Sequence, residues 1–424
     1  MNDSQNFKRT KLACYTAYFT MSSIFCVPPL LFVTLREAYN ISYTLLGTLV
    51  LVNFFTQLLI DLLFTFFSKH FNIRIMVRVM PVLTSLGLAI YAIVPTLFPQ
   101  LAYLGLAVGT VIFSVSAGLS EVLLSPMIAA IPSENPQRDM SFLHSLYAFG
   151  VLFMVVFSTL FLRVFGGECW FILVLVLALF PLVAAALFML SPMPEMESGA
   201  DVSRVGTTRE RTVALALCFA CIFFGSCAEN AMSSWVSGFM ENAVQIDKTL
   251  GDILGAAGFA VLLGIARISY AKFGKKIAPV LLFGMIGSAV CYLLIGLSGN
   301  VVISVIACAL TGLFTAMLWP GVLILMEDSI RAPGVTAFAL LAAGGDLGAS
   351  IAPQLMGVVI DSVSVSDFAT ELAPSLGITN EQLGMRAAML TNAIFPLVGI
   401  VVLLIAFRYF KKHKKVLLGT EENE

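Results

Sequence analysis

The sequence predicts an all-α membrane protein with twelve transmembrane helices, and three observations support this prediction. Of the 424 residues, 59% are hydrophobic and 12% are charged, whereas soluble domains are roughly 45–50% apolar and about 25% charged. The apolar residues form long runs, and a helix needs about 20 of them to cross the hydrocarbon of a bilayer. The runs are apolar on all sides, whereas the strands of membrane barrels alternate over about ten residues.

The candidate spans follow one another along the whole chain. The first begins after Lys8, Arg9 and Lys11 and exceeds the apolar core of a cleavable signal, which is about 7–15 residues, so we expect it to be retained. Short segments rich in Pro, Gly and Asn separate the spans. The predicted spans are 12–35, 43–67, 75–97, 101–131, 140–163, 169–191, 212–239, 249–271, 277–298, 301–326, 334–360 and 385–410.

Basic residues predict the orientation of the spans. Most of the 24 Lys and Arg residues fall in the tails and in alternate connections, on the side of the N-terminus. Basic residues accumulate on the cytoplasmic side of membrane proteins, so we expect both termini there, in a multi-pass protein of the cytoplasmic membrane. The basic tail KKHKK after Phe410 is expected to touch anionic membrane lipid. The opposite side holds Arg36, Arg163, Lys248 and Arg386.

The longest polar connection divides the chain into two related halves. This segment, 192–211, has the composition of a linker; it separates a half at 1–191 from a half at 212–410, and 411–424 forms a tail. In the fourth span Gly118-Leu119 precedes Leu124-x-Pro126, and in the tenth Gly312-Leu313 precedes Leu318-x-Pro320 at the same spacing. Repeated six-helix halves are typical of transporters that rock about a central site.

Three stretches resemble a known family. They are GLSEVLLSPMIAAIPSENPQRDMSFLHSLYAFG in spans four and five, CAENAMSSWVSG in span seven, and GIARISYAKFGKKIAPVL between spans eight and nine. The chain resembles the major facilitator superfamily, and within it the fucose-permease-like branch of sugar–proton symporters. The resemblance implies two pseudo-symmetric six-helix halves and a proton-carrying acid at Glu121. The first span has no Asp or Glu, and therefore no counterpart of that branch's first-span acid.

Charged residues within the spans are the main candidates for the mechanism. A charge at the bilayer centre costs at least about 2.5–3.5 kcal/mol, so each should face the protein interior, paired, hydrated or protonated. Glu121 lies midway along span four among apolar residues, where a carboxyl favours its protonated form. It is the predicted proton-coupling residue, and the alternative is a structural carboxyl bonded across helices. His144 in span five, whose imidazole donates and accepts, and Asp346 in span eleven are further proton-coupling candidates; a simple polar contact and a helix–helix tie are their alternatives.

The other polar residues within spans suggest a solute site and gates. Glu229, Asn230 and Trp235 in span seven offer a carboxylate, an amide and an indole to a hydroxylated solute; the alternative for Glu229 is an ion pair with a basic residue of another helix. Asp61 and Arg267 are candidates for gating ion pairs; a structural role for Asp61, snorkelling by Arg267 and contact of either residue with the solute are the alternatives. Trp319 in span ten is a further candidate for solute binding, and it precedes Pro320, which frees a carbonyl and favours a bend. Further candidates for solute hydrogen bonds are Asn53, Gln57 and Asn392, although such amides often only join helices.

The sequence thus predicts a monomeric secondary transporter of a small polar organic solute, such as a sugar, coupled to protons. We expect no metal and no cofactor, and the net charge of −1 gives no reason to expect a nucleic-acid partner. No G-x-x-x-x-G-K-[ST] or H-E-x-x-H sequence occurs, so no ATP-driven or zinc-protease chemistry is expected. The alternatives are an exporter of drugs or lipophilic metabolites, and a membrane enzyme or receptor without transport.

Overall fold

The computed structural model describes residues 7–67, 71–134, 136–194, 209–274, 276–331 and 335–418. Every regular element in these ranges is a helix, and each of the twelve predicted spans coincides with one helix or with consecutive pieces of a broken helix. Within the described residues, ten helices are long and apolar enough to cross a membrane, and Phe149–Phe165 is a shorter apolar helix. The predicted all-α membrane fold is confirmed.

The chain forms two compact units. The first unit comprises Met1–Ile41 and Val52–Ala200, and the second comprises Ser42–Leu51 and Asp201–Glu424. Helix α4 (Tyr43–Phe67) therefore contributes its first residues to the second unit and the remainder to the first. The predicted linker 192–211 falls mostly on residues 195–208, which lie outside the described residues, so this boundary stays a prediction.

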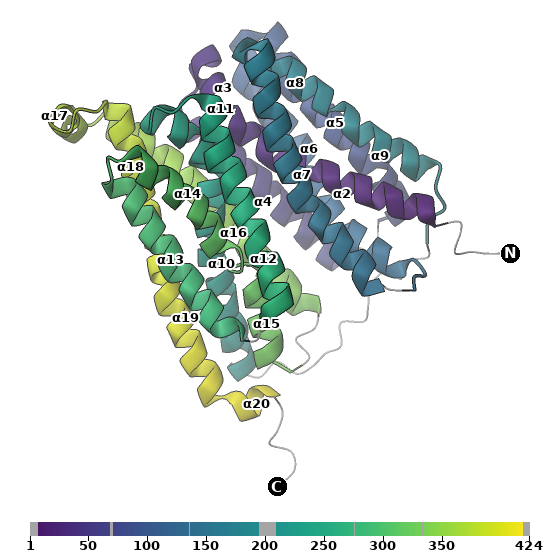
Figure 1. The fold of residues 1–424 in the computed structure, drawn as a ribbon. Coiled ribbons are helices and arrows are strands. Elements are labelled where there is room, and N and C mark those ends of the chain that lie inside the picture. The colour runs from purple at the N-terminus through teal and green to yellow at the C-terminus, as the bar shows by residue number, and fades with distance from the viewer. Residues whose placement is uncertain are drawn as a thin grey trace. The chain divides into compact units, whose positions relative to one another are not determined.

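In the first unit, α2 packs against α6, α7 and α9, and α5 packs against α6, α8 and α9; this helical bundle contains the N-terminal, purple end of the chain (Figure 1). Its elements are α2 (Lys8–Leu30), α3 (Phe32–Tyr39), α5 (Ile73–Leu97), η2 (Pro99–Leu101), α6 (Ala102–Ala130), α7 (Pro136–Phe165), η3 (Gly167–Cys169), α8 (Trp170–Leu177) and α9 (Leu179–Met189).

In the second unit, α10 packs against α14, α16 and α19, α12 packs against α14, and α13 lies beside α19 (Figure 1). Its elements are α10 (Arg209–Gly238), η4 (Phe239–Ala243), α11 (Lys248–Gly251), η5 (Asp252–Ala257), α12 (Gly258–Phe273), α13 (Ile277–Leu297), α14 (Val301–Thr315), α15 (Pro320–Ser329), α16 (Val335–Ser364), α17 (Asp367–Ser375), α18 (Asn380–Asn392), α19 (Ile394–Lys412) and α20 (Lys414–Leu418).

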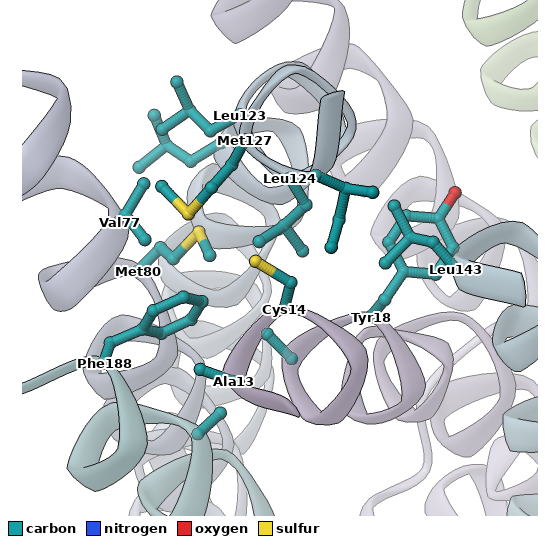
Figure 2. Close-up of a cluster of buried hydrophobic side chains, with 14 of the residues drawn as sticks. Ala13, Cys14, Tyr18, Val77, Met80, Leu123, Leu124, Met127, Leu143 and Phe188 are labelled. Atoms are coloured by element: carbon teal, nitrogen blue, oxygen red, sulfur yellow. The ribbon is translucent and has the colours of Figure 1, made fainter. Parts of the chain in front are cut away.

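A cluster of buried apolar side chains joins the helices of the first unit. Cys14 of α2, Met80 of α5, Leu124 and Met127 of α6, and Phe188 of α9 belong to it, and their side chains converge between the helices (Figure 2). Each of these five side chains is at most 1% exposed. Because lipid tails are as apolar as these side chains, close packing rather than escape from water holds such helices together.

Three spans are broken where a proline follows. Breaks lie at Ala178, at Ala316–Trp319 and at Ala393, and Pro181, Pro320 and Pro396 follow them. Proline has no N–H, and its ring clashes with the carbonyl of the residue four positions earlier, so it kinks or interrupts a helix. At Trp319-Pro320, where a bend is expected, a turn separates α14 from α15, and the Gly321 N–H still donates across it to the Met317 carbonyl at 2.8 Å.

Glycines allow close approach between helices of the second unit. A Cβ on Gly312 of α14 would lie 2.2 Å from the carbonyl oxygen of Phe259 in α12, and one on Gly348 of α16 would lie 2.4 Å from that of Phe223 in α10. A Cβ on Gly344 would lie 2.8 Å from the ring of Phe219 in α10, so Gly344 and Gly348 form a face of α16 that packs closely on α10.

Two glycine substitutions should therefore have opposite effects. Gly312→Ala should destabilise the protein by roughly 1–3 kcal/mol, because the new methyl group meets the backbone of Phe259. Gly264→Ala is the matched control, since no atom lies within 4 Å of a Cβ at that position of α12; it should be neutral or stabilise by up to about 1 kcal/mol through the higher helix propensity of alanine. Thermal unfolding of the purified protein in detergent measures both, and equal effects would contradict the packing argument.

The outward faces of the helices are apolar. Phe283 and Ile268 are 64% and 67% exposed, and Leu104 is 57% exposed. Contiguous exposed apolar surface on this scale is untypical of soluble monomers, whereas lipid-facing helices require it. The surface thus agrees with the composition in indicating a chain that spans a membrane several times.

Candidate functional site

The candidate site residues fall into two groups, one in each unit. In the first unit, amides of α4 bind to one another and to α6. The Nε2 of Gln57 lies 3.2 Å from the Oδ1 of Asn53, and the hydroxyl of Ser114 on α6 lies 2.6 Å from the same oxygen. Asn53 and Gln57 are 6% and 1% exposed. These contacts tie α4 to α6, and solute binding by the two amides stays a prediction.

Glu121 lies on the α6 face that carries Ser114. The positions of Ser114, Gly118 and Glu121 are four and three residues apart, so they share one side of the helix, and Gly118 packs against Gln57 and Ile60 of α4. Glu121 is half-buried. Its carboxylate has no hydrogen bond or ion pair with any residue in the described part of the chain. The alternative of a carboxyl bonded across helices is therefore not seen at Glu121.

In the second unit, Glu229 of α10 and Arg267 of α12 form an ion pair. The Nη2 of Arg267 donates to the Oε1 of Glu229 at 3.2 Å, and the side chains of Arg267 and Glu229 are 34% and 17% exposed. The other carboxylate oxygen of Glu229, Oε2, is buried and has no hydrogen-bond partner among the described residues. The ion pair foreseen as the alternative for Glu229 is present, and it joins a predicted solute residue to a predicted gating residue.

The same arginine also reaches the break between α14 and α15. Its Nε–H donates to the carbonyl of Ala316 at 2.9 Å. Ala316 directly follows α14, and Pro320 begins α15. Arg267 therefore connects its own helix, α12, to two other helices of the second unit: to α10 through Glu229 and to the end of α14 through Ala316. Partly buried charge-assisted hydrogen bonds of this kind are stronger than neutral ones.

Three other predicted solute residues have internal contacts in the second unit. Asn230 donates to the carbonyl and the hydroxyl of Ser226, both at 3.1 Å. The Trp235 indole donates to the carbonyl of Pro353 at 3.0 Å and is 1% exposed. Asn392 is fully buried at the break before α19 and donates to Ala388 at 3.0 Å. Solute contacts by these residues stay predictions.

Trp319, Asp346, Asp61 and His144 differ in what the structure shows. Trp319 is half-buried. A Cβ on Gly345 would lie 2.2 Å from the Trp319 ring, so the ring packs directly against this glycine. Asp346 and Asp61 are 4% and 7% exposed. The His144 side chain lies outside the described residues, as does Lys69, the nearest basic residue after Asp61. Proton coupling by Asp346 and His144, and gating by Asp61, stay predictions.

Sequence reasoning missed a polar cluster at the start of α4. The Asp361 carboxylate of α16 accepts from the backbone N–H groups of Tyr43 and Thr44, the latter at 2.6 Å, and so caps this helix. The Tyr43 hydroxyl donates to Glu381 of α18 and accepts from Asn242 at 2.8 Å. Partners some 300 residues apart carry no local sequence signal, so these contacts depend on the tertiary structure. The Ala316 carbonyl is different, because Pro320 marks it directly.

A second network, in the first unit, surrounds Asp139 near the start of α7. Asp139 lies just before the predicted span 140–163. It forms an ion pair with Lys11 of α2 and accepts from the Ser133 hydroxyl. The hydrogen bond from Lys11 and then the one from Ser133 hold the pKa of Asp139 below its usual value.

The lowered pKa of Asp139 predicts a specific pH dependence. The ionised carboxylate stabilises the folded protein above its unfolded-state pKa of about 3.9, and this contribution is lost as the pH falls through the lower folded-state value. Asp139→Asn should therefore lower the thermal midpoint at pH 7, and the difference from the unsubstituted protein should shrink below about pH 4. Glu134→Gln changes an exposed neighbouring carboxylate and should show little difference at any pH. A constant deficit of Asp139→Asn from pH 7 to pH 3 would contradict this assignment.

The two groups provide complementary chemistry. The first unit holds an intramembrane carboxyl, Glu121, for which the described part of that unit provides no counterion. The second unit holds a carboxylate, Glu229, whose charge is balanced by Arg267. A group of the first kind is suited to taking up and releasing a proton. Glu229 retains one free acceptor oxygen, and Arg267 retains N–H groups beyond its two bonds, because guanidinium carries five donors. Both residues can therefore still bind a polar ligand.

Comparisons with known proteins agree with this fold. A family model described as Major Facilitator Superfamily matches residues 13–353. Comparison with curated protein sequences finds no match.

Among solved structures, a bacterial homolog of the human lysosomal transporter Spinster, in an inward-facing and occupied conformation, is 14% identical with a TM-score of 0.74, covering 98% of this chain and 99% of that one. A D-xylose–proton symporter is 14% identical with a TM-score of 0.71, covering 92% and 97%. The E. coli fucose:proton symporter is 14% identical with a TM-score of 0.59, covering 95% and 99%. At these identities the likeness extends to the fold alone. Together with the twelve helical spans, the match of the family model over most of the sequence shows that this chain belongs to the Major Facilitator Superfamily.

Proposed function

We propose that this protein is a secondary active transporter that moves a small polar organic solute, such as a sugar or related metabolite, across the cytoplasmic membrane together with protons. Membership of the Major Facilitator Superfamily and a fold like that of solved transporters support a transport function. Proton symport and the solute class are proposed from the residues of the two groups.

The observation that carries the proposal is the environment of Glu121. A carboxylate within a membrane span is costly unless it is paired, hydrated or protonated, and Glu121 has no ion pair or hydrogen bond within the described chain. It is half-buried rather than enclosed. A proton can therefore neutralise it, and the loss of this proton restores the unfavourable charge. Such a group favours a protonated carrier during translocation.

The second unit supports a polar, hydroxylated solute. One acceptor oxygen of Glu229 has no hydrogen-bond partner in the part of the chain that the structure describes. Arg267 lies next to Glu229 in space, and Asn230 follows it in sequence. Acceptors and donors placed together bind hydroxyl groups, which both donate and accept. Two of the structures with the same fold are described as symporters of D-xylose and of fucose with protons, and this description supports a sugar-like solute for the present chain.

The two halves and the other candidate residues have roles in alternating access, in which the solute site opens to one side of the membrane at a time. Residues 1–191 and 212–410 act as two halves joined by the linker 192–211, and both termini face the cytoplasm. His144 and Asp346 assist proton transfer, and Asp61 and Arg267 take part in gating. The protein acts as a monomer, and its tail 411–424 contacts anionic lipid. The protein moves its solute without changing it chemically.

A two-stage experiment tests the proposed function. Thermal-shift screening of sugars and related metabolites identifies a ligand, because a ligand at about 100 times its Kd stabilises the folded state by roughly 2.7 kcal/mol. An inward proton gradient is then imposed on proteoliposomes, and the labelled ligand is added outside. Accumulation above equilibrium that collapses with a protonophore supports the proposal. Gradient-driven efflux of lipophilic cations without sugar uptake would show an exporter instead, and no flux of any solute would contradict transport.

A further inference from the structure

The break between α14 and α15 leaves one backbone carbonyl that needs a donor. In an uninterrupted helix the carbonyl of Ala316 would accept from the N–H of the residue four positions later. That residue is Pro320, which has no N–H. Among the described residues the recorded donor to the Ala316 carbonyl is the Nε–H of Arg267, at 2.9 Å. Within a membrane, an unsatisfied carbonyl costs several kcal/mol, so a donor at this point is needed.

The packing of α12 on α14 brings Arg267 to this carbonyl. The two helices approach closely where Gly312 meets the backbone of Phe259. Helical side chains lean toward the N-terminus of their own helix by about one turn. Arg267 lies two turns beyond Phe259, and Ala316 lies one turn beyond Gly312. The backward lean of the arginine therefore places its guanidinium level with Ala316.

The break itself is held in place by glycines of three neighbouring helices. A Cβ on Gly225 of α10 would lie 2.8 Å from the Cβ of Leu318, and one on Gly284 of α13 would lie 3.0 Å from a methyl group of Leu318. A Cβ on Gly345 of α16 would lie 2.2 Å from the Trp319 ring. The break is therefore a packed structural feature with a defined geometry, and a change in it affects α10, α13 and α16.

We infer that Arg267 is a positioning residue that ties the freed carbonyl of Ala316 to the Glu229 carboxylate, so that the α14–α15 break and the proposed solute residue respond together. The inference rests on the proposed function for its consequence in transport. One guanidinium makes both contacts, through Nε to Ala316 and through Nη2 to Glu229. Because the guanidinium is planar and rigid, the two contacts fix each other's geometry.

Binding of a solute or a proton at Glu229 affects the contacts of Arg267. A solute hydroxyl or a proton at Glu229 weakens its bond with Nη2, while Nε remains bound to Ala316. The occupancy of Glu229 therefore changes the forces on the Arg267 guanidinium, which donates to the Ala316 carbonyl at the break. This gives the second unit a direct physical connection between the solute site and a helix break, through a single side chain.

A double-mutant cycle between Arg267 and Pro320 tests the tie. Pro320→Ala restores an N–H for the Ala316 carbonyl, so Arg267 is no longer needed there. Arg267→Gln, whose side chain is too short to reach both partners, should lower the thermal midpoint by roughly 4–8 °C. In the Pro320→Ala background the same substitution should lower it by less than half as much. Pro126→Ala, at the corresponding position of α6 in the first unit, is the matched control background and should leave the full loss.

Transport kinetics give a readout that a merely structural role would not change. Arg267→Lys keeps a positive charge beside Glu229 but loses the forked donor geometry. It should raise the KM of the solute by about tenfold while the maximal rate changes by less than about threefold, because solute binding is affected more than the amount of folded carrier. In the Pro320→Ala background the rise in KM should be less than about threefold.

Two outcomes would overturn the tie: equal thermal losses for Arg267→Gln in all three backgrounds, or a fall in maximal rate with an unchanged KM for Arg267→Lys. The thermal cycle requires no transport, so it separates this inference from the proposed function. A coupled thermal cycle in a protein that moves no solute supports the tie and contradicts the transport proposal. An additive thermal cycle in a protein that transports the solute with protons contradicts the tie and supports the transport proposal.

Discussion

Glu121→Gln should abolish uphill accumulation of the solute in proteoliposomes, while exchange of labelled for unlabelled solute should continue. Glutamine preserves the size and polarity of the side chain but cannot take up or release a proton. The carrier then resembles the protonated form permanently, so its two loaded conformations still interconvert. We expect the ratio of internal to external solute to fall to about one at any imposed proton gradient, and the pH dependence of uptake to disappear.

The control for this experiment is Glu168→Gln. Glu168 lies in η3 and is exposed, and its substitution should leave both accumulation and exchange unchanged. The comparison separates loss of the coupling group from a general effect of removing a negative charge. Uphill uptake that persists unchanged in Glu121→Gln would show that another residue carries the proton.

Arg267→Met destabilises the protein by about 3–5 kcal/mol, toward the lower end of this range because 34% of the arginine side chain is exposed. Removing the arginine leaves the Glu229 carboxylate without a counterion, and both of its oxygens without a charged donor. It also removes the donor from the Ala316 carbonyl. Urea or thermal unfolding in detergent at neutral pH measures the loss.

Substituting both members of the pair distinguishes the origins of this loss. In Glu229→Met with Arg267→Met no buried charge remains, so the double variant should be more stable than Arg267→Met alone. A deficit of about 1–3 kcal/mol should remain, because the Ala316 carbonyl is still unsatisfied. Lys248→Met breaks the pair with Glu241, joined at 3.0 Å near the ends of their helices, and should cost at most about 1 kcal/mol. An equal cost for Lys248→Met and Arg267→Met would mean that the Arg267 pair has no special role.

The charged candidate residues were predicted from the free-energy cost of placing a charge within a membrane span. The structure adds which of these charges have partners. Charges in apolar runs identified Glu121, Glu229 and Arg267 without any knowledge of their neighbours. The cost of an isolated charge does not say whether a partner neutralises it. Among the residues that the structure describes, Glu121 has no partner, and Glu229 is paired with Arg267. Because Arg267 and Glu229 form one ion pair, the predicted gating role of Arg267 and the predicted solute binding by Glu229 depend on each other.

Amides and indoles were harder to interpret than charges. Asn53, Gln57 and Trp235 are polar groups in spans, and the sequence could not distinguish a group that faces a solute from one that joins helices. Asn53 contacts Ser114 of α6 and Trp235 contacts Pro353 of α16, so these two contacts join helices. The contact of Gln57 with Asn53 lies within α4. A hydrogen bond needs only one well-placed partner, and the identity of that partner depends on helix rotation and register, which local sequence does not specify.

The sequence by itself determined that this is an all-α protein of twelve spans, because lipid requires long apolar helices. It also marked the Ala316 carbonyl, through Pro320, as a group that needs a donor. Only the tertiary structure decided which donor it has, because the choice depends on a close approach at Gly312 that brings α12 beside α14. Backbone preferences and apolar runs act locally, whereas partners such as Arg267 and Glu229 meet only after helices distant in sequence have packed.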